Sequence, residues 1–225
     1  SVESALVFVK KKCVFVCFFF VMIRRPPRST QSRSSAASDV YKRQCGICQS
    51  CKQMKTLEHP NLTLVFPIPG SPDSKPGDSP FKKFKEGEMD EIRQIIQNKS
   101  RNPYDKIIVK KALVIPINFI REIKRHIYLA PQNGGQKVVV IFDAHLMNDE
   151  AANAFLKILE EPPDNSTIIL STAYPDQLLP TVQSRCQWLY VPSLPEAELK
   201  EFLIKKGYPL ENIRLAIRLS GGNVS

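Results

Sequence analysis

The chain has 225 residues, a length that suits one or two domains with a sizeable core. Hydrophobic residues make up 43% and charged residues 24%, which excludes collagen-like and wholly disordered classes. The formal net charge is +10, a value that usually points to nucleic acid or an anionic membrane surface. Residues 1–44, however, hold nine basic and two acidic side chains, so residues 45–225 carry only +3. This remainder is too small to argue for direct DNA binding by itself.

Residues 1–44 differ from the rest of the chain. An apolar run at residues 13–23 is too short to span a bilayer as a helix, and arginines and prolines follow it in place of a signal cleavage site. Residues 29–38 have no periodicity and little to bury, which is typical of a disordered tail. Residues 18–44 closely resemble translated sequencing-adapter read-through. We therefore expect residues 1–44 to be a disordered leader foreign to the natural protein; the alternative is a genuine basic leader.

A cluster of cysteines follows this leader. Cys45, Cys48 and Cys51 are each separated by two residues, so that consecutive thiolates can face one ion. Zinc prefers four sulfur or nitrogen ligands, and the fourth would lie upstream or be His59. The spacing predicts a structural zinc knuckle over residues 45–60, with three ordinary reduced cysteines as the alternative. The other cysteines form no disulfide framework, which favours a reducing, cytosolic compartment.

Strands and helices alternate through the body of the chain. Apolar runs bounded by turn residues predict strands, and stripes at helical spacing predict helices. In chain order we expect a strand at 62–66, a Pro- and Gly-rich loop at 67–87, helices within 88–97 and at 117–129, and a strand at 137–143. The next helix follows the cap Asn148, stops at Pro162 and buries Ala151, Ala152, Phe155, Leu156 and Leu159. Strands at 167–171 and 187–191 and helices at 195–206 and 211–219 complete the chain. This pattern predicts a doubly wound α/β domain with a parallel sheet.

One carboxylate stands out at the end of a predicted strand. Asp143 closes the run at 137–143, and ligands of open α/β sheets bind beyond the carboxyl ends of the strands. Asp143 is therefore a candidate site residue, with capping of the next turn as the structural alternative.

Three segments together resemble the bacterial DNA polymerase III clamp-loader subunits of the AAA+ family. They are Asp143-Ala144-His145-Leu146, residues 151–163 with the sequence AANAFLKILEEPP, and Ser184-Arg185-Cys186. The resemblance covers residues 45–225. It implies a partial AAA+ α/β domain at 61–192 that lacks its N-terminal strand and phosphate loop, a zinc-knuckle insertion, and the truncated start of a helical lid domain at 193–225.

The resemblance also implies roles for individual residues. Cys45, Cys48 and Cys51 correspond to three zinc ligands, and residues 137–143 to the Walker B strand. Asp143 and Thr172, the latter at or beside the sensor 1 position, correspond to a degenerate nucleotide site. Arg185 corresponds to the arginine finger that reaches the nucleotide of a neighbouring subunit. The alternative for Arg185 is an exposed loop cation.

Two branches of this family are open to the chain. An active AAA+ ATPase carries Glu directly after the Walker B Asp, whereas this chain has Ala144, whose methyl group cannot orient water. No GK[ST] phosphate loop occurs in residues 45–225, although it would lie upstream of the knuckle. These features favour the non-hydrolysing delta-prime branch over the gamma/tau motor branch. A third reading is a zinc-knuckle DNA-binding adaptor unrelated to the loader.

The delta-prime reading implies a set of partners and cofactors. The partners are the gamma/tau and delta subunits in a hetero-oligomer and, through that assembly, the sliding clamp and primed DNA, with no membrane. Zinc is structural, ATP with Mg²⁺ binds at the neighbouring subunit, and the chain's own nucleotide binding stays open. The expected location is the bacterial cytoplasm.

Overall fold

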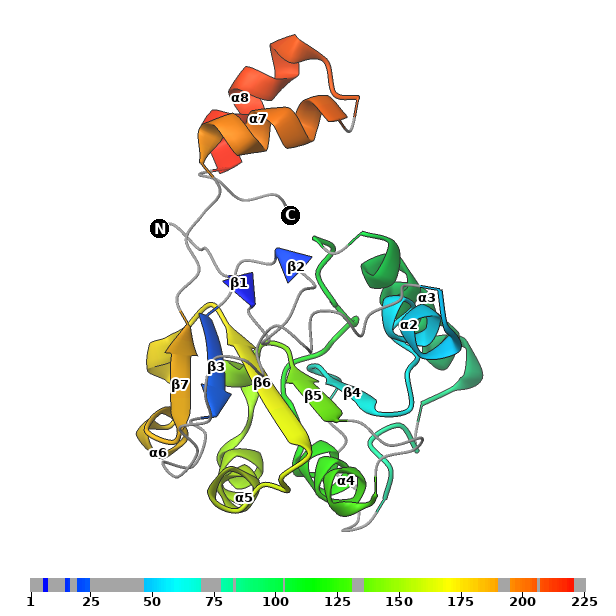
Figure 1. Cartoon of the computed structure of the whole chain (residues 1–225), viewed down its shortest axis with the longest axis vertical. Helices are drawn as coiled ribbons and strands as arrows, with labels where there is room; N and C mark the ends of the chain where they lie inside the picture. The colour runs from blue at the N-terminus through cyan, green and yellow to red at the C-terminus, as the bar shows by residue number, and fades with distance from the viewer. Residues whose placement is uncertain are drawn as a thin grey trace.

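A computed structural model describes residues 47–69, 78–82, 84–102, 104–130, 136–189, 195–205 and 207–220, together with three short strands near the N-terminus. Its centre is a five-stranded sheet of order β4-β5-β6-β3-β7 (Figure 1). The strands are β3 (Phe20–Arg24), β4 (Leu62–Val65), β5 (Lys137–Ile141), β6 (Ser166–Thr172) and β7 (Cys186–Leu189). A separate antiparallel pair joins β1 (Leu6–Val7) to β2 (Phe15–Val16).

Four of the five strands of the sheet point in the same direction, as the sequence predicts. β4 pairs with β5, and β5 with β6, both in parallel register, with Val65 opposite Ile141 and Ile141 opposite Leu170. β3 runs antiparallel to both β6 and β7, so that β7 points in the same direction as the other three strands. The result is a mixed sheet with one reversed strand in its interior.

The reversed strand corrects the prediction for the leader and for the sheet. The sequence predicts that residues 1–44 are disordered and that the domain lacks its N-terminal strand, yet β3 lies in the sheet between β6 and β7. Val21 lies opposite Ser171 on one side and Leu189 on the other. The physical reason is that β6 and β7 each present a row of backbone donors and acceptors, and an apolar extended segment satisfies both rows. The remaining leader residues, apart from β1 and β2, lie outside the described part.

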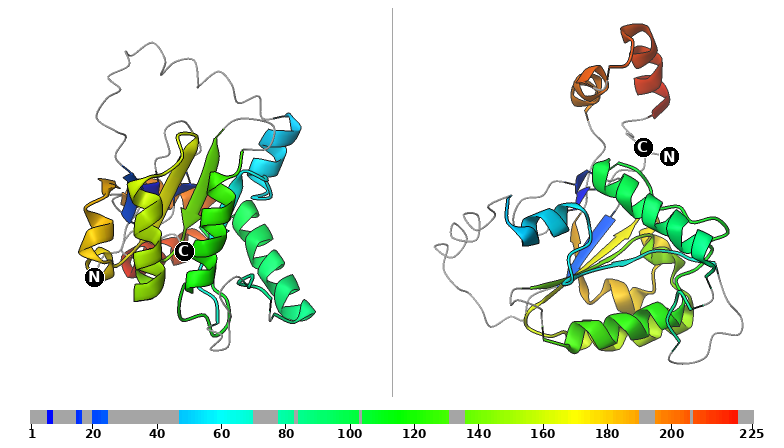
Figure 2. Two further views of the ribbon diagram at one scale, coloured as in Figure 1. Left: turned by 90° about the horizontal axis from the view of Figure 1, so that it is seen from below. Right: turned by 90° about the vertical axis from the view of Figure 1, so that its right-hand side faces the viewer.

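The described residues also form helices, of which α2 to α5 cover the two faces of the sheet (Figure 1 and Figure 2). They are α2 (Gln49–Lys55), α3 (Glu86–Arg101), α4 (Ile117–Tyr128), α5 (Asp149–Glu160), α6 (Pro180–Gln183), α7 (Glu196–Lys205) and α8 (Leu210–Ser220), with two short 3-10 turns, η2 (Ala144–Leu146) and η3 (Pro175–Gln177). α4 and α5 lie side by side under one face, whereas α2 and α3 lie on the other side, towards β4 (Figure 2). α7 and α8 stand apart from the sheet (Figure 1). Among the described residues, no helix is long and apolar enough to cross a membrane.

The core forms where these helices meet the sheet. The side chains of Val65, Ile141 and Leu170 on three neighbouring strands are fully buried, as are Ile123 of α4 and Phe155 of α5. Each buried side chain of this size contributes about 1.5–3 kcal/mol relative to an exposed one. The hydrophobic contact between α4, α5 and the strands therefore holds the body of the fold together.

The start and the buried face of α5 follow the sequence pattern closely. The side-chain oxygen of Asn148 accepts a hydrogen bond of 2.9 Å from the backbone N–H of Ala151, which confirms the expected cap. The buried residues are Ala151, Ala152, Phe155, Ile158 and Leu159, so Ile158 takes the place predicted for Leu156, which is only partly buried. The cap Ser193 expected for the next helical segment lies outside the described residues.

We predict that β3 contributes to the stability of the whole chain. Replacing Met22 by proline removes a backbone donor in a strand that pairs on both sides, so the thermal midpoint should fall by at least about 4 °C. The conservative control Met22→Val keeps the donor and should unfold close to the unmodified chain. Equal midpoints for the two variants would show that the sheet does not depend on β3. Differential scanning calorimetry of the full chain measures both.

Candidate functional site

The carboxyl edge of the sheet carries Asp143, two residues beyond the end of β5. The side chain is half-buried and its backbone has φ 49°, a left-handed conformation that Asp and Asn tolerate better than most residues. The backbone carbonyl of Asp143 accepts a hydrogen bond of 2.8 Å from Leu146, which starts η2. The Asp143 side chain makes no capping hydrogen bond to that turn, so the capping alternative is wrong.

The charge of Asp143 is set by two opposing effects. Burial raises the pKa of the Asp143 carboxyl, and positive charge on His145, Lys106 and Lys99 opposes the increase without cancelling it. Lys99 is a buried residue of α3, and its Nζ lies 5.6 Å from the ring centroid of Phe142. Basic groups from three parts of the chain therefore face this carboxylate.

Thr172 reaches the same edge from the end of β6. Its Oγ1 accepts a hydrogen bond of 3.1 Å from the backbone N–H of Tyr174 and lies 2.9 Å from Nδ1 of His145. The rings of His145 and Tyr174 contact each other edge to face, with centroids 4.9 Å apart. The structure thus connects the segments that follow β5 and β6, as expected for two strands with neighbouring carboxyl ends.

The residues of this edge do not fit a bound Mg²⁺ ion. Mg²⁺ requires near-octahedral oxygen coordination, usually with one or two carboxylates. Asp143 supplies one carboxylate, and the next residue, Ala144, is fully buried and apolar. The neighbouring groups His145, Lys106 and Lys99 are basic, and the described part of the chain contains no group of three His, Cys, Asp or Glu residues suited to a metal ion.

Arg185 lies at the opposite, amino edge of the sheet, directly before β7. Its Nη2 donates a hydrogen bond of 2.7 Å to Oε1 of Glu160, and its Nη1 donates one of 2.8 Å to the backbone carbonyl of Thr181. The Arg185 side chain retains 35% of its exposure. Arg185 is therefore fixed by two hydrogen bonds while it stays accessible to solvent, unlike an unconstrained loop side chain.

The two edges are separated by the length of the strands. β6 has seven residues, which corresponds to about 20 Å at the usual rise per residue. Asp143 and Thr172 lie at one end of this span, whereas Arg185 and Glu160 lie at the other, where β7 begins and α5 ends. Within one copy of the chain, Arg185 consequently cannot reach a ligand bound beside Asp143.

The cysteine cluster lies partly outside the described residues. Cys48 precedes α2 and Cys51 lies in its first turn, three residues later and thus on the same side of the helix, whereas Cys45 is not described. His59 accepts a hydrogen bond of 3.1 Å at Nδ1 from the backbone N–H of Asn61, and its Nε2 lies 2.7 Å from Oγ of Ser50. Both ring nitrogens of His59 are thereby engaged, which argues against His59 as a fourth ligand. One thiol at the N-cap of α2 and one in its first turn fit two of the ligand positions of a zinc knuckle.

Cys186 differs from this cluster. It is 1% exposed, and burial raises the pKa of its thiol to about 12. A protonated, buried thiol is neither a metal ligand nor a nucleophile. Its role is to pack β7 into the core directly after Arg185.

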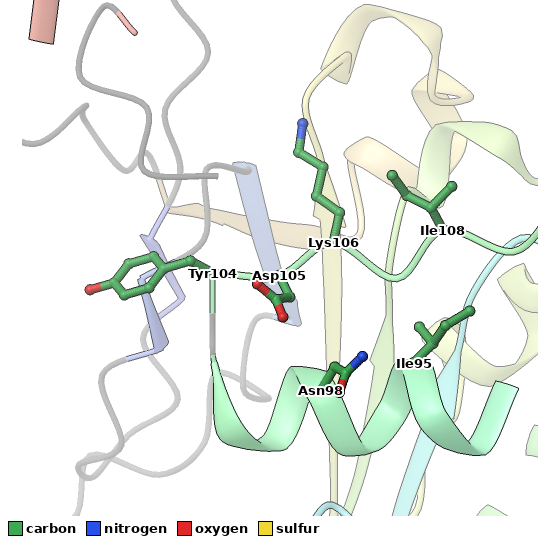
Figure 3. A pocket seen from close by; sticks show the side chains of 6 residues that line it. All are labelled: Ile95, Asn98, Tyr104, Asp105, Lys106 and Ile108. Carbon is green, nitrogen blue, oxygen red and sulfur yellow. The ribbon is translucent and has the colours of Figure 1, made fainter. Parts of the chain in front are cut away.

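An open groove of about 430 Å³ lies between α3 and the following segment. Ile95 and Asn98 rise from α3 towards Asp105 and Ile108, while the Lys106 side chain points away from α3 (Figure 3). Asp105 accepts a hydrogen bond from the Asn102 side chain, so its carboxylate is already engaged. Tyr104 contacts Phe202 of α7, with ring centroids 4.8 Å apart. The groove therefore borders the contact between the α/β body and the C-terminal helices.

Comparison with known proteins identifies the family. Residues 30–195 match the sequence profile described as DNA polymerase III, delta subunit. The chain belongs to this family. It is 28% identical over 180 residues to the DNA polymerase III subunit delta' of Escherichia coli K12, covering 80% of this chain and 42% of that protein.

Other relatives come from both branches. The delta' subunit of Pseudomonas aeruginosa is 36% identical over 111 residues, 48% of this chain and 34% of that protein. A gamma/tau subunit of Mycobacterium tuberculosis H37Rv is 30% identical over 109 residues, 46% of this chain and 19% of that protein. A crystal structure of a gamma subunit-related protein from Thermotoga maritima covers 76% of this chain and 58% of its own, at 24% identity and a TM-score of 0.38. The chain spans less than half the length of the curated relatives it matches here.

Sequence reasoning found some of the groups at the two edges of this delta-family chain and missed others. It selected Asp143, Thr172 and Arg185, and the structure brings the first two to one edge and leaves Arg185 at the other. It assigned no role to Glu160 or Lys99, because a charge on a helix usually faces solvent. A signal for Lys99 existed: the apolar residues Ile92, Ile95 and Ile96 precede it on α3, and Lys99 follows Ile92 at a spacing of seven.

We predict that Asp143→Asn stabilises the chain at neutral pH. Because burial raises the pKa of Asp143 above its unfolded value, ionisation costs stability; this cost is absent below the unfolded pKa of about 4, grows as the pH rises from there to the folded pKa, and is complete above it. The thermal midpoint of the Asn variant should exceed that of the unmodified chain at pH 7, and the gain should vanish near pH 4.

Asp143→Ala is the matched control for this prediction. Alanine removes the charge but is poorly suited to φ 49°, which costs about 1 kcal/mol, so it should melt roughly 2–4 °C below the Asn variant. A gain from Asn that persists unchanged at pH 4 would contradict the electrostatic explanation. Thermal denaturation across this pH range measures all three chains.

Proposed function

We propose that this chain acts as a delta-prime-like, non-hydrolysing subunit of the DNA polymerase III clamp loader, with an AAA+ fold. The observation that carries the proposal is the carboxyl edge, where fully buried Ala144 follows Asp143 and basic groups surround the single carboxylate. Hydrolysis of a phosphoanhydride needs a metal ion and a group that orients water, and Ala144 cannot supply the second. Family membership and the two delta' relatives support the assignment.

Arg185 is the functional group of this subunit in the proposal. It lies at the edge remote from its own Asp143, it is partly exposed, and its guanidinium has N–H donors beyond those bound by Glu160 and Thr181. Such a group suits the stabilisation of developing negative charge on ATP bound, with Mg²⁺, by a neighbouring gamma/tau subunit. The delta subunit completes the hetero-oligomer, and the sliding clamp and primed DNA are partners of the whole assembly in the bacterial cytoplasm.

The alternative is a gamma/tau motor subunit. Relatives named as gamma or gamma/tau subunits match this chain at 30–35% identity, but over 46% of its length. The delta' proteins of Escherichia coli and Yersinia pestis match over 80% and 79%. Coverage and Ala144 both favour the delta-prime proposal.

Replacing Arg185 by alanine tests the proposed role. In a clamp-loader complex reconstituted with this chain, Arg185→Ala should lower ATP turnover by about 10²-fold or more, since an arginine finger supplies 10³ or more in related transfers. The chain alone should show negligible turnover. Arg93→Ala, which removes another exposed arginine in an ion pair of 2.7 Å with Asp90, is the matched control and should have no effect. Unchanged turnover with Arg185→Ala would remove Arg185 from the neighbour's site, and robust turnover by the chain alone would favour the motor alternative.

The zinc knuckle is part of the same proposal, with Cys45, Cys48 and Cys51 as three structural ligands. We expect about one zinc ion per full chain, measured by metal analysis after purification under reducing conditions. Cys48→Ser or Cys51→Ser should abolish the bound zinc, whereas Cys186→Ala should retain it because that thiol is buried and protonated. Zinc-free chains with intact cysteines would contradict the knuckle.

A further inference from the structure

Glu160 makes a contact across the fold that its position in the sequence does not suggest. It is the last residue of α5, and its carboxylate lies 2.7 Å from Arg185, 25 residues further along the chain. The side chains of Glu160 and Arg185 are 49% and 35% exposed. An ion pair this accessible to water adds little to the free energy of folding. Its main physical effect is to select one orientation of the guanidinium.

The orientation is fixed at two points. Nη1 of Arg185 donates to the carbonyl of Thr181 at 2.8 Å, and Nη2 donates to Glu160, so acceptors from α6 and α5 hold two nitrogens of a rigid planar group. Two of the five N–H groups are used in these bonds, and three remain for another acceptor. A lysine at this position could not be held in the same way, because its ammonium has no plane to fix.

The backbone on both sides of Arg185 is anchored. Val182 is fully buried and Cys186 is 1% exposed, and the backbone N–H of Arg185 donates to the carbonyl of Val182 at 3.2 Å. The end of α5 is also tied down, because Tyr128 Oη donates a hydrogen bond of 2.7 Å to the backbone carbonyl of Glu161. The backbone positions are thus set by packing, whereas the direction of the Arg185 side chain is set by Glu160 and Thr181.

We propose that Glu160 is a positioning residue for Arg185. It holds the guanidinium so that its remaining N–H groups face outwards, towards the phosphates of a nucleotide on an adjoining subunit. This inference rests on the proposed role of Arg185. Pre-organisation matters at such a site because a misplacement of about 1 Å can cost as much as 10²-fold in rate. Glu160 partly neutralises the positive charge of Arg185, but it also fixes the orientation of the guanidinium.

The test is the steady-state ATP turnover of the reconstituted loader complex with single and double variants of this chain. Glu160→Ala should lower kcat about tenfold and leave KM for ATP unchanged, because the oriented arginine acts in the transition state rather than in ground-state binding. Glu160→Gln should lose less, since its amide oxygen can still accept from Nη2. The neighbouring Glu161→Gln, which makes the same change of charge one residue away, should behave as the unmodified chain.

Two further readouts separate positioning from a structural role. The thermal midpoint of the Glu160→Ala chain should stay within about 2 °C of the unmodified chain, as expected for an exposed ion pair. Combined with Arg185→Ala, Glu160→Ala should cause no additional loss of kcat, because its effect passes through the arginine.

The outcomes distinguish this inference from the proposed function. If Arg185→Ala lowers turnover but Glu160→Ala behaves like Glu161→Gln, the positioning role is wrong and the arginine finger stands. A further loss in the double variant overturns the inference too, because Glu160 would then act independently of Arg185. If Arg185→Ala itself has no effect, the proposed function fails and the role of Glu160 fails with it.

Discussion

The arrangement of functional groups depends on the direction of β6. This strand is buried over its last five residues and pairs with β5 on one side and β3 on the other. Because β4, β5, β6 and β7 all point in the same direction, the residues that follow these strands lie at the carboxyl edge of the sheet. The residues that precede them lie at the amino edge. Asp143 follows β5 and Thr172 ends β6, and His145 lies between the two segments, 2.9 Å from Oγ1 of Thr172. Arg185 precedes β7 and meets the end of α5. The polarity of the backbone thus divides the chain into an edge that could hold a ligand and an edge that presents a cation.

The elements that sequence reasoning predicted well are those whose burial leaves a periodic pattern. The run at β5, the stripe of isoleucines on α4 and the capped start of α5 were all found, with ends correct to within one or two residues, because apolar periodicity reflects a local choice of face. β3 was missed for a different reason. An apolar stretch in an unusual leader carries no periodic signal for a strand that pairs on both sides, and its pairing depends on β6 and β7, more than 140 residues away. The ion pair of Glu160 with Arg185 was missed because neither residue indicates in sequence that its partner is charged.

The carboxyl edge illustrates how electrostatics limit chemistry. A carboxylate that is partly desolvated and faced by Lys99, Lys106 and His145 has its negative charge compensated only in part from within the chain. A divalent cation would have to compete with these groups for a single ligand. The left-handed backbone at Asp143 does not require a carboxylate either, since Asn would adopt this conformation as readily. The segment around Asp143 therefore resembles a metal-binding segment in sequence, but it provides a single carboxylate surrounded by basic groups and followed by the apolar Ala144.

The separation of the two edges has a consequence for symmetry. An interface in which one edge of a subunit faces the opposite edge of the next is heterologous, so subunits that associate in this way form a row with a direction. Under the proposed function, this chain offers a cation at one end of its sheet but no working catalytic edge at the other. It can therefore provide an arginine to the site of a neighbouring subunit without receiving an arginine at its own carboxyl edge. Such a subunit belongs at the terminus of a directional row, and it sets where the row ends as well as which face of its neighbour becomes active.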